Sequence, residues 1–447
     1  MGCPRYRLVT DMSTSATHIA VILYGSRGDI QPGVCLALEL LERGHRVSVA
    51  VPPNLVAFAR ALGAGEVYSI GVDTHTAWSS DEAADSRRRS PIARLRYAVT
   101  TVRDGFAAFD RSLTGLFLDD RAPLADADVV VAAPLCQDRA LAITERLGIA
   151  LVVLRFGPMS ENGVLGAVPG WSDSWSPDWK RRSWRFADRV TWLATGWNEM
   201  LFRRRLGLPP VFGPLPKRLA AQGIRQIQAY DQEIVPGIAD EWGPLRPVVG
   251  FFDLSSRDRL ALDESGGDSS ELMSWLDAGE QPVFVSFGSM PIDDPDRLIG
   301  IFAGAAAELG YRVLFSLGPR RGRDATDPGI YYTGAVDHSA ILPRCCAVVH
   351  HGGAGTTAAG LRAGLPTMIC AVTADQPFWA ARIRALGVGY GTRLGKVTDE
   401  IARIGLRTIL DPEIVCTTQQ LADRLAAPDT AVAAAAAVVE AEVVVHT

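Results

Sequence analysis

Short apolar segments that alternate with helical segments constrain this chain more than any other feature of its sequence. His18–Tyr24 is apolar enough for a buried strand, residues 33–43 are typical of a helix, and Arg46–Val51 is again typical of a strand. A strand, a helix and a second strand in this order form a right-handed unit with parallel strands. The alternation continues to residue 160 and starts again at Val283. The sequence therefore predicts an α/β fold of two tandem doubly wound domains.

The length of 447 residues suits two or three domains. Prolines and glycines between the two alternations indicate a linker, and the alanine-rich C-terminal segment predicts a helix that can pack back on the first domain. The expected division is a disordered extension (1–17), an N-terminal Rossmann-like domain (18–230), a linker (231–250), a C-terminal Rossmann-like domain (251–428) and a final helix (429–447).

Charge and cysteine content exclude several classes of protein. A formal net charge of −5 argues against a nucleic-acid-binding protein. The seven cysteines form no CxxC pair, so neither a zinc site nor a disulfide framework is indicated, and a cytoplasmic location fits. No apolar run reaches the length of a transmembrane helix.

A glycine-rich turn in the C-terminal half has the composition of a phosphate-binding site. His350–Thr357 follows the apolar run Ala347–Val349 and precedes a helical segment. A strand, a glycine turn and a helix start together offer free backbone N–H groups and the positive end of a helix dipole. The side chains of His351, Thr356 and Thr357 could donate hydrogen bonds to phosphate oxygens. The alternative is a tight turn that binds nothing.

A second glycine-containing loop, Gly25–Pro32, follows the first strand and holds Asp29 close to Arg27. The carboxylate of Asp29 could be a general base for a hydroxyl group, or it could be a helix-capping or turn aspartate, and the spacing favours neither. The loop lacks the three-glycine fingerprint of dinucleotide-binding enzymes, and the chain has no P-loop.

Asp375 and Gln376 follow the next strand after the phosphate turn. A carboxylate beside an amide can hold adjacent sugar hydroxyls by hydrogen bonds. The alternative is a capped helix start, because Pro377 follows directly. Proximity to the phosphate turn favours the sugar-binding role.

Tryptophans are concentrated in residues 161–215. Six of the ten tryptophans lie between Trp171 and Trp197, among several arginines, and a further run of arginines occupies residues 86–90. The tryptophan segment could be a core helix pair flanked by arginines, or a surface that receives an apolar substrate or touches an anionic bilayer. The sequence does not decide between these.

Together these motifs resemble those of the GT-B glycosyltransferases of family 1. The similarity is greatest to the actinobacterial branch that glycosylates glycolipids and glycopeptides, including mycobacterial-type glycolipid rhamnosyl- and glucosyltransferases, and it extends to sterol glucosyltransferases. Four segments carry the resemblance: Tyr24–Pro32, Phe287–Met290, His350–Thr357 and Ala374–Pro377. The resemblance implies a GT-B fold, in which the two Rossmann-like domains face each other across a cleft.

The resemblance also implies a role for each matching residue. Asp29 corresponds to the catalytic base. Donor phosphates would contact Ser289, His351, Gly352, Gly353, Gly355 and Thr356. The nucleoside would contact Val336 and His338, and the donor sugar Asp375 and Gln376. Candidates for the acceptor loops are Arg27, Gly28, Trp171 and Trp175.

The implied activity is inverting transfer of a hexose or deoxyhexose from a nucleotide sugar to a hydrophobic acceptor such as a cell-envelope glycolipid. No metal or other cofactor is implied, and the protein would be cytoplasmic, with a possible peripheral membrane contact. One departure concerns the donor: plant-type UDP-glucose enzymes have a ribose-binding glutamate where this chain has Ala359, which favours a dTDP sugar such as dTDP-rhamnose without excluding UDP-glucose. The alternatives are a GT-B epimerase and a catalytically silent partner protein.

Overall fold

The computed structural model describes residues 16–74, 105–262, 270–288, 292, 294–317, 320–324, 326–334 and 336–446. Three predictions fall wholly or largely outside these residues: the N-terminal extension, the arginine run at residues 86–90, and the phosphate contact of Ser289. None of the described helices is both long enough and apolar enough to cross a bilayer.

A six-stranded parallel sheet forms the centre of the N-terminal half, in the order β3-β2-β1-β4-β5-β6. Its strands are β1 (His18–Ile22), β2 (Arg46–Val51), β3 (Glu66–Ser69), β4 (Val129–Ala132), β5 (Ala150–Arg155) and β6 (Gln226–Gln228). Helices cover both faces, which explains why the central strands β1, β4 and β5 are almost uniformly apolar. One face is covered by α1 (Arg27–Glu42), α2 (Val56–Ala61) and α18 (Pro428–His446), and the other by α6 (Gln137–Leu147), α7 (Pro177–Arg205) and α8 (Leu215–Ala221).

The C-terminal half has a seven-stranded sheet in the order β13-β12-β11-β7-β8-β10-β9, parallel except for the short β9. Its strands are β7 (Val283–Ser286), β8 (Val313–Ser316), β9 (Gly322–Arg323), β10 (Ile330–Tyr332), β11 (Ala347–His350), β12 (Thr367–Ala371) and β13 (Gly389–Arg393). The surrounding helices are α11 (Ser270–Asp277), α12 (Pro295–Glu308), α13 (His338–Ile341), α14 (Ala354–Arg362), α15 (Gln376–Ala385), α16 (Asp399–Ile409) and α17 (Pro412–Ala422).

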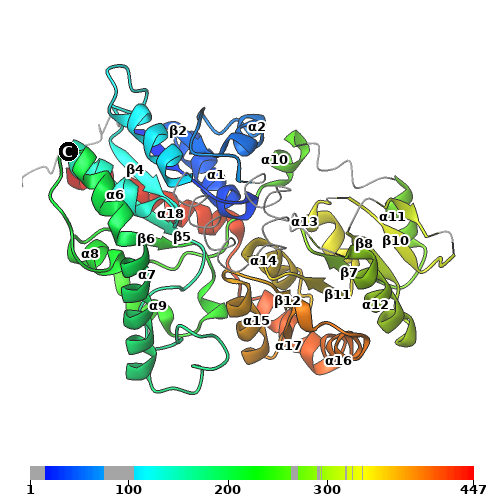
Figure 1. The fold of residues 1–447 in the computed structure, drawn as a ribbon. Helices are drawn as coiled ribbons and strands as arrows, with labels where there is room; N and C mark the ends of the chain where they lie inside the picture. The colour runs from blue at the N-terminus through cyan, green and yellow to red at the C-terminus, as the bar shows by residue number, and fades with distance from the viewer. Residues whose placement is uncertain are drawn as a thin grey trace, which may run out of the picture.

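Two segments join the halves. The C-terminal helix α18 returns from the C-terminal half and packs on the N-terminal sheet, where Ala431, Ala435 and Val439 are fully buried (Figure 1). The segment between the two sheets contains the short helices α9 (Ile238–Trp242) and α10 (Ser256–Ala261). Its side chains share a core cluster with α15, in which the buried ring of Trp379 lies at the centre.

The order of strands reverses at one point in each sheet, between β1 and β4 in the first and between β7 and β11 in the second. Ligands of doubly wound sheets bind at the carboxyl ends of the strands beside such a reversal. The Asp29 loop follows β1, and the glycine turn follows β11. Both motifs therefore lie where this topology opens a crevice.

The start of α1 differs from the sequence-based expectation. The helix begins at Arg27, and not at Gly33, and it continues through Pro32. Ser26 and Asp29 form a capping box that starts the helix early. Pro32 lies in the second turn and removes one backbone hydrogen bond there, yet the helix continues through it. Asp29 is consequently a helical residue of the first turn.

Candidate active site

The carboxylate of Asp29 is held in place at the start of α1. Its Oδ2 accepts hydrogen bonds from the backbone N–H of Ser26 at 2.8 Å and from the Ser26 hydroxyl at 2.9 Å. Gly25, with φ of +134°, makes room for this arrangement, because a Cβ at that position would overlap the Asp29 carboxylate. No hydrogen bond reaches Oδ1 from the described part of the chain, so this oxygen is available to a ligand.

Burial raises the pKa of Asp29 above its usual range, although the two hydrogen bonds from Ser26 partly oppose the rise. Burial raises the pKa of Asp375, the hydrogen bond from Trp379 partly opposes the rise, and the negative charge of Asp29 adds the smallest contribution to it. The two carboxylates come from different halves of the molecule and are close enough to interact electrostatically. A site formed by both halves is the arrangement that a transfer between two substrates needs.

The glycine turn after β11 leaves the N-terminus of α14 without a side-chain cap. Gly353 is the N-cap residue, and no side chain of the described residues caps the helix there. Gly352 has φ of +96°, and a Cβ on it would come within 2.6 Å of Ile369 Cγ2. Its N–H donates to His350 Nδ1 at 2.9 Å, which fixes the turn. The first-turn N–H groups of α14 are therefore available to an anion.

His351 lies between two glycine backbones at this helix start. A Cβ on Gly353 would approach His351 Nε2 to 2.7 Å, and one on Gly288 would approach Cε1 to 3.3 Å. Burial, together with the charge of nearby His338, lowers the pKa of His351 to about 4. Its buried Nδ1 has no hydrogen-bond partner among the described residues. A neutral imidazole with an unsatisfied ring nitrogen is suited to donate one hydrogen bond to a diphosphate oxygen.

The two threonines of the turn differ in what their hydroxyls do. Thr357 is fully buried, and its hydroxyl donates to the Gly353 carbonyl at 2.9 Å, within the helix. That bond removes Thr357 from the set of phosphate donors that the sequence suggested. Thr356 is only partly buried, and its hydroxyl makes no hydrogen bond within the described residues. Gly355 is exposed, with open space where a side chain would be.

The predicted nucleoside contacts lie after β10. The side chain of Val336 is buried in a core cluster with Phe284, so a ligand could meet only its main chain. His338 begins α13, and its ring packs edge-on against Phe284 at a centroid distance of 5.8 Å. Because His338 also lowers the pKa of His351, the nucleoside and phosphate segments adjoin each other.

Asp375 and Gln376 shape the loop after β12. Gln376 Oε1 accepts from the backbone N–H groups of Val372 (2.8 Å) and Thr373 (3.1 Å). Asp375 is the N-cap residue of α15, but its side chain does not cap the helix, since Oδ2 accepts from Trp379 Nε1 at 2.8 Å. Directly before Asp375, Ala374 has φ of +55°, an uncommon backbone conformation for alanine that often marks a ligand-binding loop.

The acceptor-loop candidates do not form one cluster. The guanidinium of Arg27 lies 4.7 Å from the ring centroid of Phe58, and Gly28 is exposed beside it. Trp171 and Trp175 pair edge-on with each other at 5.1 Å in the segment before α7. Trp171 is 69% exposed, so it is not part of a core.

Two residues that the sequence analysis missed connect these parts. The indole N–H of Trp379 donates to Asp375, the N-cap residue of the same helix. Their four-residue spacing in the sequence could have predicted this contact. Asp253 accepts from Arg362 of α14 at 2.7 Å and from Gln31 of α1 at 3.5 Å. It thus links the helix that carries Asp29 to the helix that starts at the glycine turn, and no local sequence pattern indicates such a contact.

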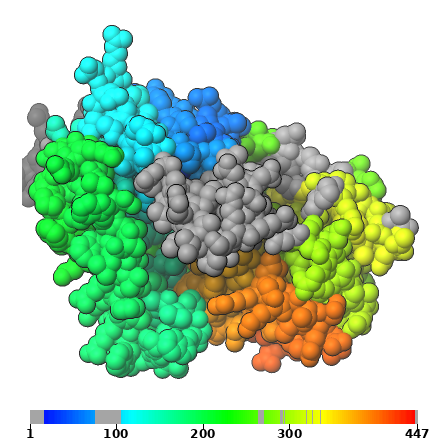
Figure 2. Space-filling model, in the orientation of Figure 1, coloured from blue at the N-terminus to red at the C-terminus, as the bar shows by residue number. Residues whose placement is uncertain are grey.

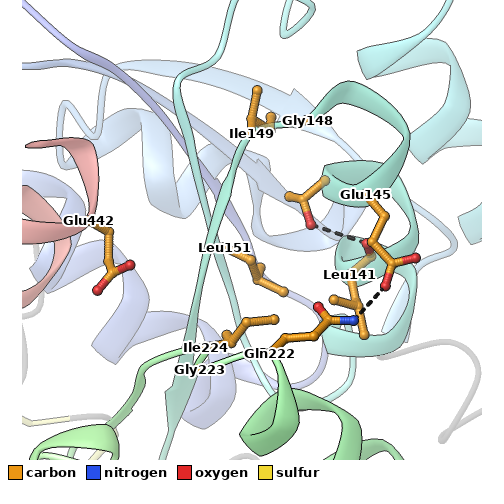
Figure 3. A pocket seen from close by; sticks show the side chains of 10 residues that line it. Leu141, Glu145, Gly148, Ile149, Leu151, Gln222, Gly223, Ile224 and Glu442 are labelled. Atoms are coloured by element: carbon orange, nitrogen blue, oxygen red, sulfur yellow. Dashed lines mark hydrogen bonds between the residues drawn. The ribbon is translucent and has the colours of Figure 1, made fainter. Parts of the chain in front are cut away.

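A separate hollow of about 310 Å³ lies away from this site (Figure 3). It is lined by residues that include Ile149 and Ile224, which precede β5 and β6, so it lies at the amino ends of these strands. Its carboxylates are already engaged: Glu145 accepts from Gln222 at 3.0 Å, and Glu442 pairs with an arginine. Among the described residues, no three His, Cys, Asp or Glu side chains gather as metal ligands would.

Sequence and structure comparisons identify what this chain is similar to. The family model of the erythromycin biosynthesis protein CIII-like C-terminal domain matches residues 306–445. An uncharacterized glycosyltransferase of Mycobacterium tuberculosis is 38% identical over 433 residues, which cover 94% of this chain and 97% of the relative. A sterol 3-beta-glucosyltransferase of Arabidopsis thaliana is 29% identical over 93% of this chain and 66% of its own length.

Solved structures with the same fold are glycosyltransferases as well. The glycotransferase of kitacinnamycin superposes with a TM-score of 0.67 at 20% identity, covering 96% of this chain and 100% of the other. The glycosyltransferase VinC, solved in complex with dTDP, gives a TM-score of 0.57 at 18% identity, covering 96% and 99%. The predicted GT-B fold is thereby confirmed. With the mycobacterial match over 94% of this chain, these findings establish that the chain belongs to the GT-B glycosyltransferases of family 1.

Proposed function

We propose that the protein is an inverting glycosyltransferase that moves a hexose or deoxyhexose from a nucleoside-diphosphate sugar to a hydroxyl of a hydrophobic acceptor. One arrangement carries this proposal: Asp253 accepts hydrogen bonds from Gln31 of α1 at 3.5 Å and from Arg362 of α14 at 2.7 Å, and so ties the helix that carries Asp29 to the helix that starts at the glycine turn. A base for the acceptor and a carboxylate for the donor sugar then share one crevice.

In this mechanism Asp29 Oδ1 accepts the proton of the acceptor hydroxyl as that oxygen attacks the anomeric carbon. The new glycosidic bond forms as the bond from the anomeric carbon to the diphosphate oxygen breaks, and the diphosphate leaves with the electron pair. A single displacement inverts the anomeric configuration. The open N–H groups of α14 and the neutral His351 stabilise the leaving diphosphate. We propose that no metal ion is required, because these groups would supply that stabilisation.

We propose a thymidine diphosphate sugar as the donor, with UDP-glucose as the alternative. Two observations support thymidine: Ala359 occupies the position where plant-type enzymes hold both ribose hydroxyls with a glutamate, and the structurally similar VinC was solved with dTDP. A deoxyribose lacks the 2′-hydroxyl that such a glutamate would bind. For the acceptor, we propose a hydrophobic molecule such as a cell-envelope glycolipid, reached at the inner face of the plasma membrane.

The purified chain should be tested first for donor binding. Thermal shift with dTDP and UDP is expected to show stabilisation by dTDP, which at a hundredfold excess over Kd amounts to about 2.7 kcal/mol. Stabilisation by UDP alone would replace the donor proposal with its alternative. The matched variants Thr356→Val and Thr357→Val should differ, with only the first weakening binding, because Thr357 already bonds Gly353.

Transfer itself is tested with the selected nucleotide sugar and a set of apolar alcohols. Expected results are release of nucleoside diphosphate that depends on the acceptor, an inverted anomeric configuration by NMR, and unchanged rates in EDTA. Interconversion of the donor sugar without acceptor would identify an epimerase. Donor binding without any turnover would favour a silent partner protein. A retained configuration would disprove the single displacement.

A further inference from the structure

Helix α7 carries an apolar stripe on its solvent-facing side. Large side chains exposed by between 38% (Leu201) and 74% (Leu193) line it: Trp179, Phe186, Val190, Leu193, Trp197 and Leu201. Their spacings are three, four or seven residues, so at about 100° per residue all six lie within about 40° of one line along the helix. The stripe runs for about 33 Å at 1.5 Å per residue.

Among the described residues, the buried side chains of α7 lie on the opposite side of the helix. Trp184 and Phe202 are buried there, and the Trp184 indole N–H donates to the Leu165 carbonyl at 2.7 Å. The helix lies along the outer edge of the N-terminal half, away from the C-terminal half (Figure 1). In the space-filling view, the green part of the chain that includes this helix lies on the left (Figure 2). Exposed apolar residues usually occur singly, so a continuous stripe marks a contact surface.

Basic side chains border the stripe. Arg182 and Arg189 are exposed, make no ion pair within the described residues, and lie about 60° and 80° to one side of the stripe's line. Arg204, also exposed and without an ion pair there, lies within the width of the stripe. The guanidinium of Arg182 lies over the Trp179 ring at 5.0 Å. Arg181 and Arg185, by contrast, are paired with glutamates of the protein. The unpaired arginines therefore leave positive charge beside the apolar stripe.

We propose that this face of α7 docks on an anionic membrane surface. An amphipathic helix lying in the bilayer interface has an apolar face, basic borders and tryptophans near the headgroups, and α7 presents all three. A second copy of this chain fits less well, because a two-fold contact would bring the same arginines together. The inference goes beyond the proposed transfer reaction and does not depend on it.

Docking of α7 on a membrane would also position the segment that precedes this helix. The helix follows directly on the segment that carries the exposed Trp171 and its partner Trp175. Docking would hold that segment at the lipid surface. An acceptor with a lipid tail could then enter the crevice without crossing water.

The test is flotation of the full-length protein with vesicles of phosphatidylcholine containing about one third phosphatidylglycerol, compared with phosphatidylcholine alone. Binding is expected only to the anionic vesicles, and it should weaken when added salt shortens the Debye length from about 30 Å to about 3 Å. Leu193→Glu should lower the bound fraction on the order of tenfold or more. Arg182→Glu with Arg189→Glu should lower it on the order of tenfold as well.

The matched control is Ile404→Glu, which changes an exposed apolar residue of α16 in the other half and should bind as the wild type does. Circular dichroism and donor hydrolysis of each variant show whether it is folded. Absence of flotation, or equal flotation of the Leu193 and Ile404 variants, would overturn the proposal. So would a concentration-dependent dimer in sedimentation velocity that Leu193→Glu abolishes, since the stripe would then be a protein interface.

Discussion

Replacing Asp29 by asparagine tests whether its carboxylate accepts the proton of the acceptor hydroxyl. The substitution keeps the shape of the side chain and an oxygen that can accept from the Ser26 N–H, but it removes the base. General-base catalysis contributes roughly 10²- to 10⁴-fold, so kcat should fall by that factor. A thousandfold loss corresponds to about 4 kcal/mol in the barrier.

The structural cost of the same substitution should be much smaller. Asp29 Oδ2 accepts two hydrogen bonds, both from Ser26, at 2.8 and 2.9 Å. Loss of a charge-assisted capping contact costs about 1 kcal/mol. The variant should therefore remain folded and bind the donor normally, because the predicted donor contacts lie in the other half.

The assay measures product formation at saturating donor, together with calorimetric donor affinity. Ser26→Ala is the matched control: it removes one hydrogen bond to the carboxylate and keeps the base, so kcat should fall less than about tenfold. Because that bond lowers the pKa of Asp29, its loss should move the acid limb of the pH–rate profile to higher pH. The limb itself should lie above the usual aspartate value of 3.8, since only the ionised base reacts. Transfer by the asparagine variant within about tenfold of the wild type would refute the assignment.

Three further predictions concern the C-terminal half. Gly352→Ala should lower the free energy of unfolding, measured in urea, by about 1–3 kcal/mol and weaken dTDP binding. The reason is that Gly352 has a φ of +96° and that a Cβ there would lie 2.6 Å from Ile369 Cγ2. Unchanged stability would contradict this prediction. His351 has a pKa lowered from 6.5 to about 4, so the unfolded state gains a proton first as pH falls through this window. Between pH 6.5 and about 4, the free energy of unfolding should therefore fall by up to about 3 kcal/mol more for the wild type than for His351→Asn. Equal pH dependence of the two unfolding free energies would contradict this prediction. Trp379→Phe removes the 2.8 Å hydrogen bond to Asp375. It should therefore raise KM for the donor several-fold and increase the ratio of donor hydrolysis to transfer. If product analysis finds that ratio unchanged, Trp379 does not position Asp375 for the donor.

The positions of several candidate site residues at strand ends were predictable because their sequence signals are local. The glycines of the 350–357 turn, the carboxylate after the first strand and the Asp375–Gln376 pair each follow an apolar strand. Since strand ends of a doubly wound sheet open on the ligand crevice, sequence order alone predicted their common edge.

Other assignments needed the packed structure. Thr356 and Thr357 are equivalent in sequence, but the hydroxyl of Thr357 is used within the helix. The true start of α1 depended on a reciprocal contact between Ser26 and Asp29 that outweighed the signal of Pro32. The tryptophan-rich segment could be core or surface by composition, and the structure gives a single long helix with one exposed face.

The sequence by itself determined the alternation of strands and helices, the family, and the residue types at the strand ends. These follow from side-chain periodicity and short motifs, which involve residues near each other in the chain. Only the tertiary structure decided which groups meet across the two halves, such as Asp253 with both Gln31 and Arg362. Such contacts join residues separated by a hundred positions or more. They depend on how two complete sheets pack together, and no local pattern of residues encodes that packing.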